Sequence, residues 1–153
     1  MADSPEHSSA TDKGTPPPRW FLKAYTKLNV FVYRISGGRL MNTLAGMPII
    51  LVGMIGARSG KRISIPLMYV PYEGGFVLVA SQGGAPNNPA WYYNLIKNPE
   101  IEITHRGKTE RCAARQVREE EKDKLWPICV EYYPPYEEYQ ERTSRNIPVF
   151  FCE

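Results

Sequence analysis

The sequence predicts an α+β protein in which a small antiparallel β-barrel carries helices on its outside. Short apolar and β-branched runs are separated by turns of only a few residues, such as 57–61 and 72–75. Such spacing favours hairpins over the long helical connections of parallel sheets. Six runs of this kind in one layer would leave strand edges exposed, and closing the sheet into a barrel removes these edges. Fourteen Pro and twelve Gly among the 153 residues argue against a helical bundle.

The first part of the chain divides into a tail and a helix. Residues 1–18 are polar and rich in Ser, Thr, Pro and Asp, so we expect a disordered tail ahead of one domain that spans residues 19–153. Pro18 suits the first position of a helix, and apolar residues recur three and four apart from Trp20 to Ile35, until two glycines end the pattern. This amphipathic helix either packs on the core or lies at a membrane surface or over an apolar site as a lid.

The remaining elements follow from shorter patterns. Strands are predicted at residues 49–55, 63–70, 76–81, 100–106, 109–117 and 147–152. A helix is predicted at residues 90–97, where Asn88 would be the N-cap and Pro89 the first helical residue. Two more helices are predicted at residues 119–132, where an acidic first turn suits the helix dipole, and at residues 136–143.

Composition excludes several classes of protein. No apolar stretch reaches the roughly 20 residues that cross a bilayer, and the chain opens with polar residues rather than a secretory signal peptide, so we expect a cytoplasmic protein. Cys112, Cys129 and Cys152 lack CxxC spacing and are predicted to be buried free thiols. With only two His, the sequence predicts no metal site and no His-based catalytic triad. Any chemistry is therefore expected to depend on a reactive group that the chain does not supply.

Charge is distributed unevenly along the chain. Residues 19–115 carry thirteen Lys or Arg against four Asp or Glu, whereas residues 116–153 carry five against nine. A basic body predicts an anionic ligand, and nucleic acid, an anionic membrane surface and a phosphorylated cofactor are all compatible with it.

Three segments are candidates for a binding site. In residues 80–95 a strand ends in a Gly-Gly loop that leads into a helix N-terminus, where free backbone N–H groups favour an anion and Trp91 offers a flat apolar face. In residues 56–62 three cations and a hydroxyl crowd one hairpin turn, which suits phosphate or carboxylate groups, although neither a Walker A loop nor a GxGxxG motif is present. Each segment is equally compatible with an ordinary solvated loop.

The third segment is aromatic. Tyr133, Tyr136 and Tyr139 are spaced three apart, so they would share one face of a helical turn. That face either belongs to the core or lines a pocket for a flat hydrophobic compound.

Taken in order, the motifs resemble the deazaflavin-dependent nitroreductase family of actinobacteria, whose close members include quinone reductases. The resemblance runs from Trp20 to Glu153 and is carried by Arg58-Ser59-Gly60 with Pro66, Ala80-Ser81-x-Gly83-Gly84, Asn88-Pro89-x-Trp91-Tyr92-x-Asn94-Leu95 with Asn98-Pro99, Trp126-Pro127, Tyr133-Pro134-x-Tyr136-x-x-Tyr139, and Arg145-x-Ile147-Pro148-Val149 with Cys152-Glu153. It implies a split β-barrel fold of the flavin-reductase type. It also implies coenzyme F420 as cofactor, a deazaflavin with a phosphate and a polyglutamate tail.

The resemblance also implies roles for individual residues. The phosphate and tail of the cofactor would be held by Arg58, Ser59, Gly60 and Lys61, with Arg62 assisting. The deazaflavin would lie along Ile63, Ser64, Ile65, Pro66 and Met68, in a groove completed by Val79, Ala80, Ser81, Gln82, Ala90, Trp91, Tyr92 and Asn94. The substrate side would be lined by Trp20, Met68, Tyr133, Tyr136 and Tyr139.

The implied reaction is hydride transfer from reduced coenzyme F420 to a flat electrophile such as a quinone, an activated enone or a nitro compound. The cofactor would supply the reactivity and the protein would orient it. The accompanying proton would come from solvent, from Tyr136 or from Ser81. Relatives often carry Lys at the position of Gln82 and an aromatic residue near that of Met68, so these two departures bear on pocket shape and substrate.

Other functions share parts of this pattern. A split barrel that binds flavin mononucleotide or haem would have the same fold, but a short phosphate needs fewer cations than this turn provides. Nucleic-acid binding is disfavoured because the aromatic residues gather in the acidic third of the chain. A cofactor carrier without turnover is a third possibility. We expect a small-molecule substrate, a monomer or weak dimer, and peripheral contact with the inner membrane face through the N-terminal helix.

Overall fold

The computed structural model describes residues 43–44 and 47–153, and the predicted tail and N-terminal helix, with Trp20, lie outside them. The strands are β1 (Thr43–Leu44), β2 (Met47–Ile55), β3 (Arg62–Met68), β4 (Val70–Tyr72), β5 (Gly75–Val79), β6 (Glu100–His105), β7 (Lys108–Gln116) and β8 (Val149–Cys152). The helices are α2 (Ala90–Lys97), α3 (Glu119–Tyr132) and α4 (Pro135–Glu141), and a 3-10 turn, η1, covers Gln82–Gly84.

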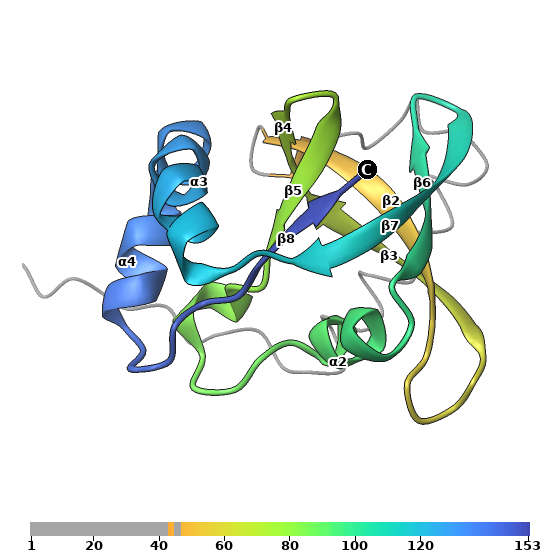
Figure 1. The fold of residues 1–153 in the computed structure, drawn as a ribbon, viewed down its shortest axis with the longest axis horizontal. Helices are drawn as coiled ribbons and strands as arrows, with labels where there is room; N and C mark the ends of the chain where they lie inside the picture. The colour runs from red at the N-terminus through yellow and green to blue at the C-terminus, as the bar shows by residue number, and fades with distance from the viewer. Residues whose placement is uncertain (1–42, 45–46) are drawn as a thin grey trace, which may run out of the picture.

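The described strands form one antiparallel sheet that curls on itself (Figure 1). Its order is β1-β2-β6-β7-β8-β5-β4, and β3 also pairs with β2. β3 and β4 therefore belong to opposite ends of the sheet, yet only Tyr69 separates them in the chain. A connection this short requires the two ends to approach each other. The predicted α+β class and curled antiparallel architecture are thus confirmed, with three helices packed outside the half-barrel.

Most predicted element boundaries agree with the structure to within two residues. The helices predicted at residues 90–97 and 119–132 have the observed bounds. The strand predicted at residues 63–70 is divided at Tyr69, because the chain crosses there from one end of the sheet to the other. The predicted cap of α2 was wrong: Pro89 is the N-cap, and the side chain of Asn88 accepts a hydrogen bond from Arg145 instead.

Two hydrophobic clusters form the core. The first fills the inside of the curled sheet and includes Ile50, Leu78 and Phe150 from strands and Leu95 from α2, which covers one open end. The second lies between β4, β5 and β8 and the helices α3 and α4, where Leu125, Cys129 and Tyr136 are buried. Packing of this kind on both faces accounts for the continuous apolar run of β8, since a strand covered on both sides alternates little.

The three cysteines are free thiols, as predicted. Cys129 and Cys152 are buried and Cys112 is half-buried. Burial raises the pKa of the Cys129 thiol to about 11. No helix within residues 43–44 and 47–153 has the length and apolar character needed to cross a membrane.

Candidate functional site

The basic turn, residues 56–61, joins β2 to β3 and presents its cations to solvent. The backbone closes through bonds from Gly56 N–H to Lys61 O (2.9 Å) and from Gly60 N–H to Gly56 O (2.9 Å). Gly60 has φ +63°, which a residue with a side chain rarely adopts. The Ser59 hydroxyl accepts a hydrogen bond from Lys61 N–H (3.2 Å). The side chains of Arg58 and Lys61 are exposed. Neither forms an ion pair with any residue that the structure describes.

Helix α2 holds this turn in place through hydrogen bonds. Ala57 N–H donates to Asn94 Oδ1 (2.8 Å), and Lys97 Nζ donates to Ala57 O (2.8 Å). Asn98 Nδ2 donates to Ile55 O (3.3 Å) just before the turn. The structure therefore places Asn94, an expected cofactor ligand, at 8% exposure with its carboxamide oxygen bonded to the turn. Asn94 therefore fixes the backbone of Ala57, the residue before Arg58.

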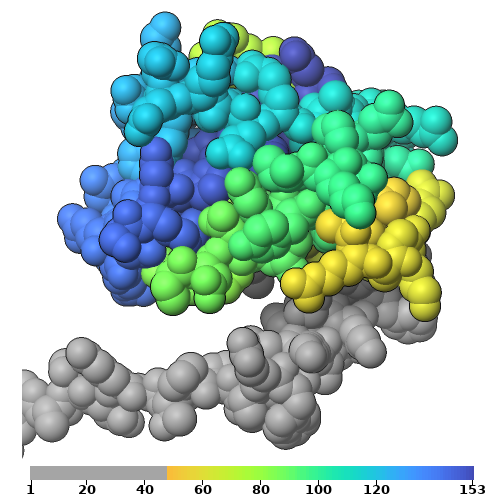
Figure 2. All heavy atoms as spheres, turned by 60° about the horizontal axis from the view of Figure 1, so that its bottom comes forward, coloured from red at the N-terminus to blue at the C-terminus, as the bar shows by residue number. Residues whose placement is uncertain are grey.

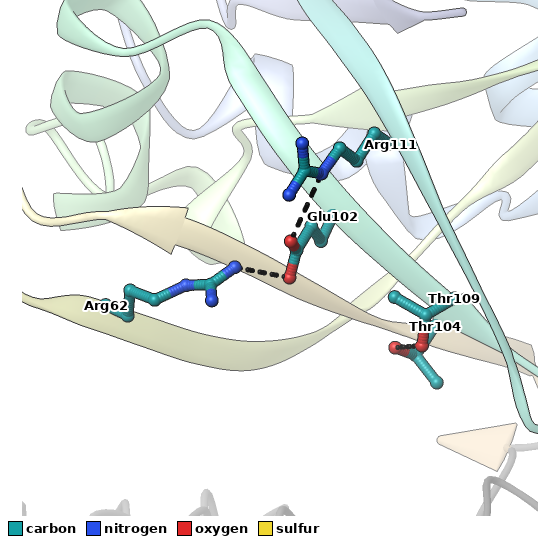
Figure 3. A network of polar contacts seen from close by, with 5 residues as sticks. All are labelled: Arg62, Glu102, Thr104, Thr109 and Arg111. Atoms are coloured by element: carbon teal, nitrogen blue, oxygen red, sulfur yellow. Dashed lines mark hydrogen bonds and ion pairs between the residues drawn. The ribbon is translucent and has the colours of Figure 1, made fainter.

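The third cation of this region, Arg62, already has a partner. Its Nη2 lies 2.6 Å from Glu102 Oε2, and Arg111 Nε lies 3.6 Å from the other oxygen of the same carboxylate (Figure 3). Both arginine side chains are largely exposed. Arg62 is thus held by Glu102 of β6, whereas Arg58 and Lys61 project from the turn.

Strand β3 lies at an edge and carries the residues expected beside the deazaflavin. Among the described strands it pairs with β2 alone, and its Pro66 faces Leu51. A proline in a sheet turns its nitrogen away from the paired strand. Because hydrogen-bonded and non-hydrogen-bonded pairs alternate, the backbone groups of Arg62 and Met68 point toward the same outer edge. The side chain of Ile65 packs against the first core cluster, which anchors this edge strand to the core.

The Gly-Gly loop follows β5 and has an unusual backbone. Gln82, Gly83 and Gly84 all have positive φ, at 47°, 64° and 76°. A Cβ on Gly84 would lie 2.6 Å from Tyr139 O, so only glycine permits this contact with α4. Val79, Ala80 and Ser81 are buried beneath the loop, whereas the side chain of Gln82 is exposed.

Arg145 fixes the loop through four hydrogen bonds, which its guanidinium donates to the segment before α2. Its Nε donates to Ala85 O (2.8 Å) and its Nη2 to Ser81 O (2.7 Å) and Ala80 O (3.1 Å). Its Nη1 donates to Asn88 Oδ1 (2.7 Å). The backbone of Arg145 makes two further bonds: its carbonyl oxygen accepts from Gln140 Nε2 (2.8 Å), and its N–H donates to Thr143 Oγ1 (3.4 Å). The sequence shows Arg145 only as part of the resemblance, and its role depends on residues far away in the chain.

Trp91 and Tyr92 lie on the core side of α2. The Trp91 ring is 5.8 Å from that of Phe150, and the Tyr92 ring is 5.7 Å from it. Both side chains are half-buried, and the Tyr92 hydroxyl donates to Gln116 Oε1 (3.3 Å). They anchor the helix to the sheet, while Ala90 at its first position is exposed. Figure 2 shows α2 between the basic turn and the region of α4 on one face of the molecule.

The three tyrosines meet, although Tyr133 lies outside α4 as the C-cap of α3. The rings of Tyr133 and Tyr136 are 5.0 Å apart, and the hydroxyls of Tyr133 and Tyr139 are 3.4 Å apart. The hydrogen bond between these hydroxyls raises the pKa of Tyr133 to about 12. Tyr136 is only 3% exposed, and burial raises its pKa. Its hydroxyl has no hydrogen-bond partner among the described residues.

The fold and the arrangement of its parts define a class of protein: a curled antiparallel sheet with a basic turn, an edge strand and a Gly-Gly loop arranged around helix α2. The family of F420H(2)-dependent quinone reductases matches residues 25–153. The chain belongs to this family, which confirms the resemblance to deazaflavin-dependent enzymes. It is an oxidoreductase whose cofactor is reduced coenzyme F420.

Individual relatives agree. The chain is 35% identical over 127 residues to an F420H(2)-dependent quinone reductase of Mycobacterium tuberculosis, covering 80% of this chain and 85% of the relative. A solved F420-H2 dependent reductase, FDR-A, shares 44% identity with a TM-score of 0.64, covering 69% of this chain and 94% of that one. A second solved chain, described as a domain-swapped dimer, shares 38% identity with a TM-score of 0.65, covering 83% and 97%.

The described residues fit a cofactor of this kind. Coenzyme F420 carries a phosphate and several carboxylates, and the exposed, unpaired Arg58 and Lys61 suit such groups. The flat deazaflavin suits the edge of β3, where a polar backbone lies beside Ile63 and Met68.

Proposed function

We propose that this protein transfers a hydride from reduced coenzyme F420 to a flat electrophile, with quinones as the first choice and activated enones and nitro compounds as further substrates. The observation that carries the proposal is the position of two cations that form no ion pair with a described residue, on a turn that α2 bonds through Ala57 and that leads into the edge strand β3. The cofactor supplies two electrons as hydride, and the protein binds and orients it.

The anionic end of the cofactor would lie at the basic turn. Arg58 and Lys61 would contact the phosphate, while Ser59 and Gly60 shape the turn around it. The deazaflavin would then extend along residues 63–68 toward Ser81 and Gln82. Since Asn94, Val79 and Ala80 are buried, their part would be to support this groove from behind.

The substrate would enter on the side of the tyrosine cluster. Tyr139 packs its backbone against Gly84, so the cluster adjoins the Gly-Gly loop. Tyr133 and Met68 are half-buried and would present apolar surface to a flat ring. Trp20, which lies outside the described residues, would complete this wall. Reduction of a quinone to a quinol requires one proton besides the hydride, and we assign it to Tyr136, Ser81 or solvent.

A fluorescence titration tests the cofactor. We expect micromolar binding of oxidised and reduced coenzyme F420 and none of flavin mononucleotide, whose single phosphate leaves one of the two cations without a partner. Turnover with a quinone would then be followed by loss of the reduced deazaflavin. Preference for flavin mononucleotide, or the absence of quinone reduction by a protein that binds F420, would contradict the proposal.

Quinones dissolve in membranes, so we also propose peripheral association with the inner face of the cell membrane through the predicted helix at residues 18–37. Co-sedimentation with anionic lipid vesicles tests this, and removal of residues 1–37 should abolish it. A relative forms a domain-swapped dimer, whereas we propose a monomer or weak dimer for this chain. Light scattering during size-exclusion chromatography distinguishes the two.

A further inference from the structure

The two ends of the curled sheet meet at Tyr69, the single residue between β3 and β4. Strand pairing does not hold this residue in place. The register pairs of β3 end at Met68, opposite Ile49, and those of β4 begin only at Val70. The Tyr69 side chain is instead buried in the first core cluster, at 8% exposure. The contacts of this side chain therefore determine where the end of β3 lies.

His105, the last residue of β6, makes the polar contact to this side chain. The Tyr69 hydroxyl and His105 Nε2 are 3.0 Å apart and form a hydrogen bond. The two rings meet edge to face with their centroids 5.3 Å apart, and the ring of Phe76 in β5 meets the Tyr69 ring in the same way at 5.3 Å. Tyr69 thus connects the junction of β3 and β4 to β6 and to β5.

The direction of the hydrogen bond follows from burial. The Tyr69 hydroxyl has no other hydrogen-bond partner among residues 43–44 and 47–153. If the imidazole carried its proton on Nε2, the phenolic proton would be buried without an acceptor, which is costly. The neutral tautomer with its proton on Nδ1 avoids this cost, because Nε2 then accepts from the hydroxyl. Protonation of His105 occupies Nε2, so the hydroxyl loses its acceptor.

The surroundings of His105 oppose its protonation. Burial, followed by the charge of the neighbouring Arg106, lowers the pKa of His105. On β7, Lys108 is paired in register with it, and the exposed Glu110 lies two residues further along that strand. Burial, and then Tyr132 of α3, raise the pKa of the phenol that donates to it. The imidazole is therefore neutral at neutral pH and gains a proton only below about pH 6.5, the usual pKa of histidine.

We propose that the hydrogen bond between Tyr69 and His105 positions Met68 against the quinone, and that protonation of His105 releases Met68 and weakens quinone binding. This inference rests on the proposed function, which places Met68 on the substrate side of the site. Met68 makes the last pair of an edge strand, and such a pair opens easily unless the next residue is anchored. The other end of β3 follows the basic turn, so the anionic end of the cofactor is held independently of Tyr69. His105 is thus a positioning residue.

The test compares the quinone KM of the wild-type protein with that of His105→Gln at about pH 5.5 and about pH 7.5, on either side of the usual histidine pKa. Glutamine also carries an acceptor atom at the ε position, so it can keep the hydrogen bond, but it does not titrate. We expect the ratio of wild-type KM to variant KM to rise about three- to tenfold at the lower pH, the range for one lost hydrogen bond. Titration of the cofactor or the quinone affects both proteins equally and cancels in this ratio.

Two further variants separate positioning from a general loss of structure. Tyr69→Phe keeps the ring contacts but removes the hydrogen bond, so its quinone KM should be about three- to tenfold higher than that of the wild-type protein at about pH 7.5. Its dissociation constant for F420 should stay within about twofold of the wild-type value, because the basic turn lies at the far end of β3. Arg106→Asn removes a positive charge beside His105 and suits the positive φ of that position, 49°. In this variant the KM should begin to rise at a higher pH.

Nitrogen-15 NMR observes the imidazole without any cofactor. The chain has two His, so His7→Gln leaves the signals of His105 alone. Nε2 should be unprotonated at about pH 7.5 and should gain its proton at a pH below the usual histidine pKa.

The outcomes separate this inference from the proposed function. If the wild-type protein reduces no quinone at either pH, the proposed function fails. If it reduces quinones but the KM ratio is the same at both pH values, or Tyr69→Phe keeps the wild-type KM, positioning by His105 alone is overturned. A protonated Nε2 at about pH 7.5 overturns it as well, whatever the activity.

Discussion

At the scale of single residues, Arg145 organises the segment that leads into α2. The loop has few internal hydrogen bonds, chiefly Gly84 N–H to Ser81 O (3.0 Å) and Ala85 N–H to Gln82 O (3.2 Å). The guanidinium supplies four more, from a residue that precedes β8. Its planar donors match several acceptors at once, which an ammonium group does not.

We expect Arg145→Lys to disturb the loop although it preserves the charge. Loss of several hydrogen bonds should lower the free energy of unfolding by about 1–3 kcal/mol. The KM for reduced F420 should rise more than kcat falls, because the loop borders the proposed cofactor groove. Urea denaturation and steady-state kinetics measure both effects. Arg142→Lys is the control, since the Arg142 guanidinium pairs with Glu138 and lies over the Tyr139 ring, and donates no hydrogen bond to the described loop. An unchanged KM in Arg145→Lys would show that the loop needs no such support.

Tyr136 is the second test at this scale. Its hydroxyl is buried, and the raised pKa keeps it protonated through neutral and mildly alkaline pH. If Tyr136 is the proton donor, Tyr136→Phe should lower kcat by about 10²-fold, the lower end of the range for general acid catalysis. Cofactor affinity should stay the same, and wild-type turnover should not fall between pH 7 and pH 9 through loss of this proton.

Stability supplies the internal check for Tyr136→Phe. Because the change removes a buried hydroxyl without a described partner, the free energy of unfolding should stay the same or rise slightly. Unchanged turnover in a stable variant would remove Tyr136 as the donor, and Ser81→Ala would then be the next variant to measure.

At the scale of elements, α2 connects the Gly-Gly loop to the basic turn. One end of the helix follows the Gly-Gly loop, and its last turn bonds to the basic turn through Asn94 and Lys97. Its inner face is fixed to the sheet by contacts of Trp91 and Tyr92 with Phe150. A change in the position of this helix would therefore move the Gly-Gly loop and the basic turn together.

Asn94→Ala tests this connection. The variant leaves the half-buried Ala57 N–H without its partner, which should cost about 1–3 kcal/mol of stability. The affinity for F420 should also fall, since Arg58 and Lys61 would no longer be held in place. Asn87→Ala, in the exposed loop before α2, serves as the comparison. Equal F420 affinity in the two variants would show that the turn keeps its shape without α2.

The elements also show how far the sequence alone leads. Local patterns located α2 and α3 with their observed bounds, because a proline before the first turn, an acidic first turn and apolar spacing act within a few residues. The division at Tyr69 and the role of Asn88 were missed, because each depends on a contact with a distant part of the chain. The same holds for the site: the basic turn was visible in the sequence, whereas the clamp by Arg145 and the Glu102 network were not.

At the scale of the whole molecule, Phe150 joins the sheet to the helix that covers it. It is fully buried and is paired in register with Leu78 and Gln116. Phe150→Ala should lower the free energy of unfolding by about 3–5 kcal/mol, the usual cost of removing a core aromatic side chain. Tyr93→Ala, at 53% exposure on the outer side of α2, should change it by less than about 1 kcal/mol. A similar loss in both variants would indicate that Phe150 is not a central contact.

The position of β8 has a consequence for how the protein assembles. β8 lies between β7 and β5, and its pairing with β5 joins Phe76 to Cys152 and Val79 to Val149. During synthesis, β5 is complete at Val79 but finds no permanent neighbour on that side until β8 emerges at Val149. The nascent chain must therefore carry an unsatisfied strand edge while residues 80–148 are made, which slows folding and exposes it to pairing with other chains.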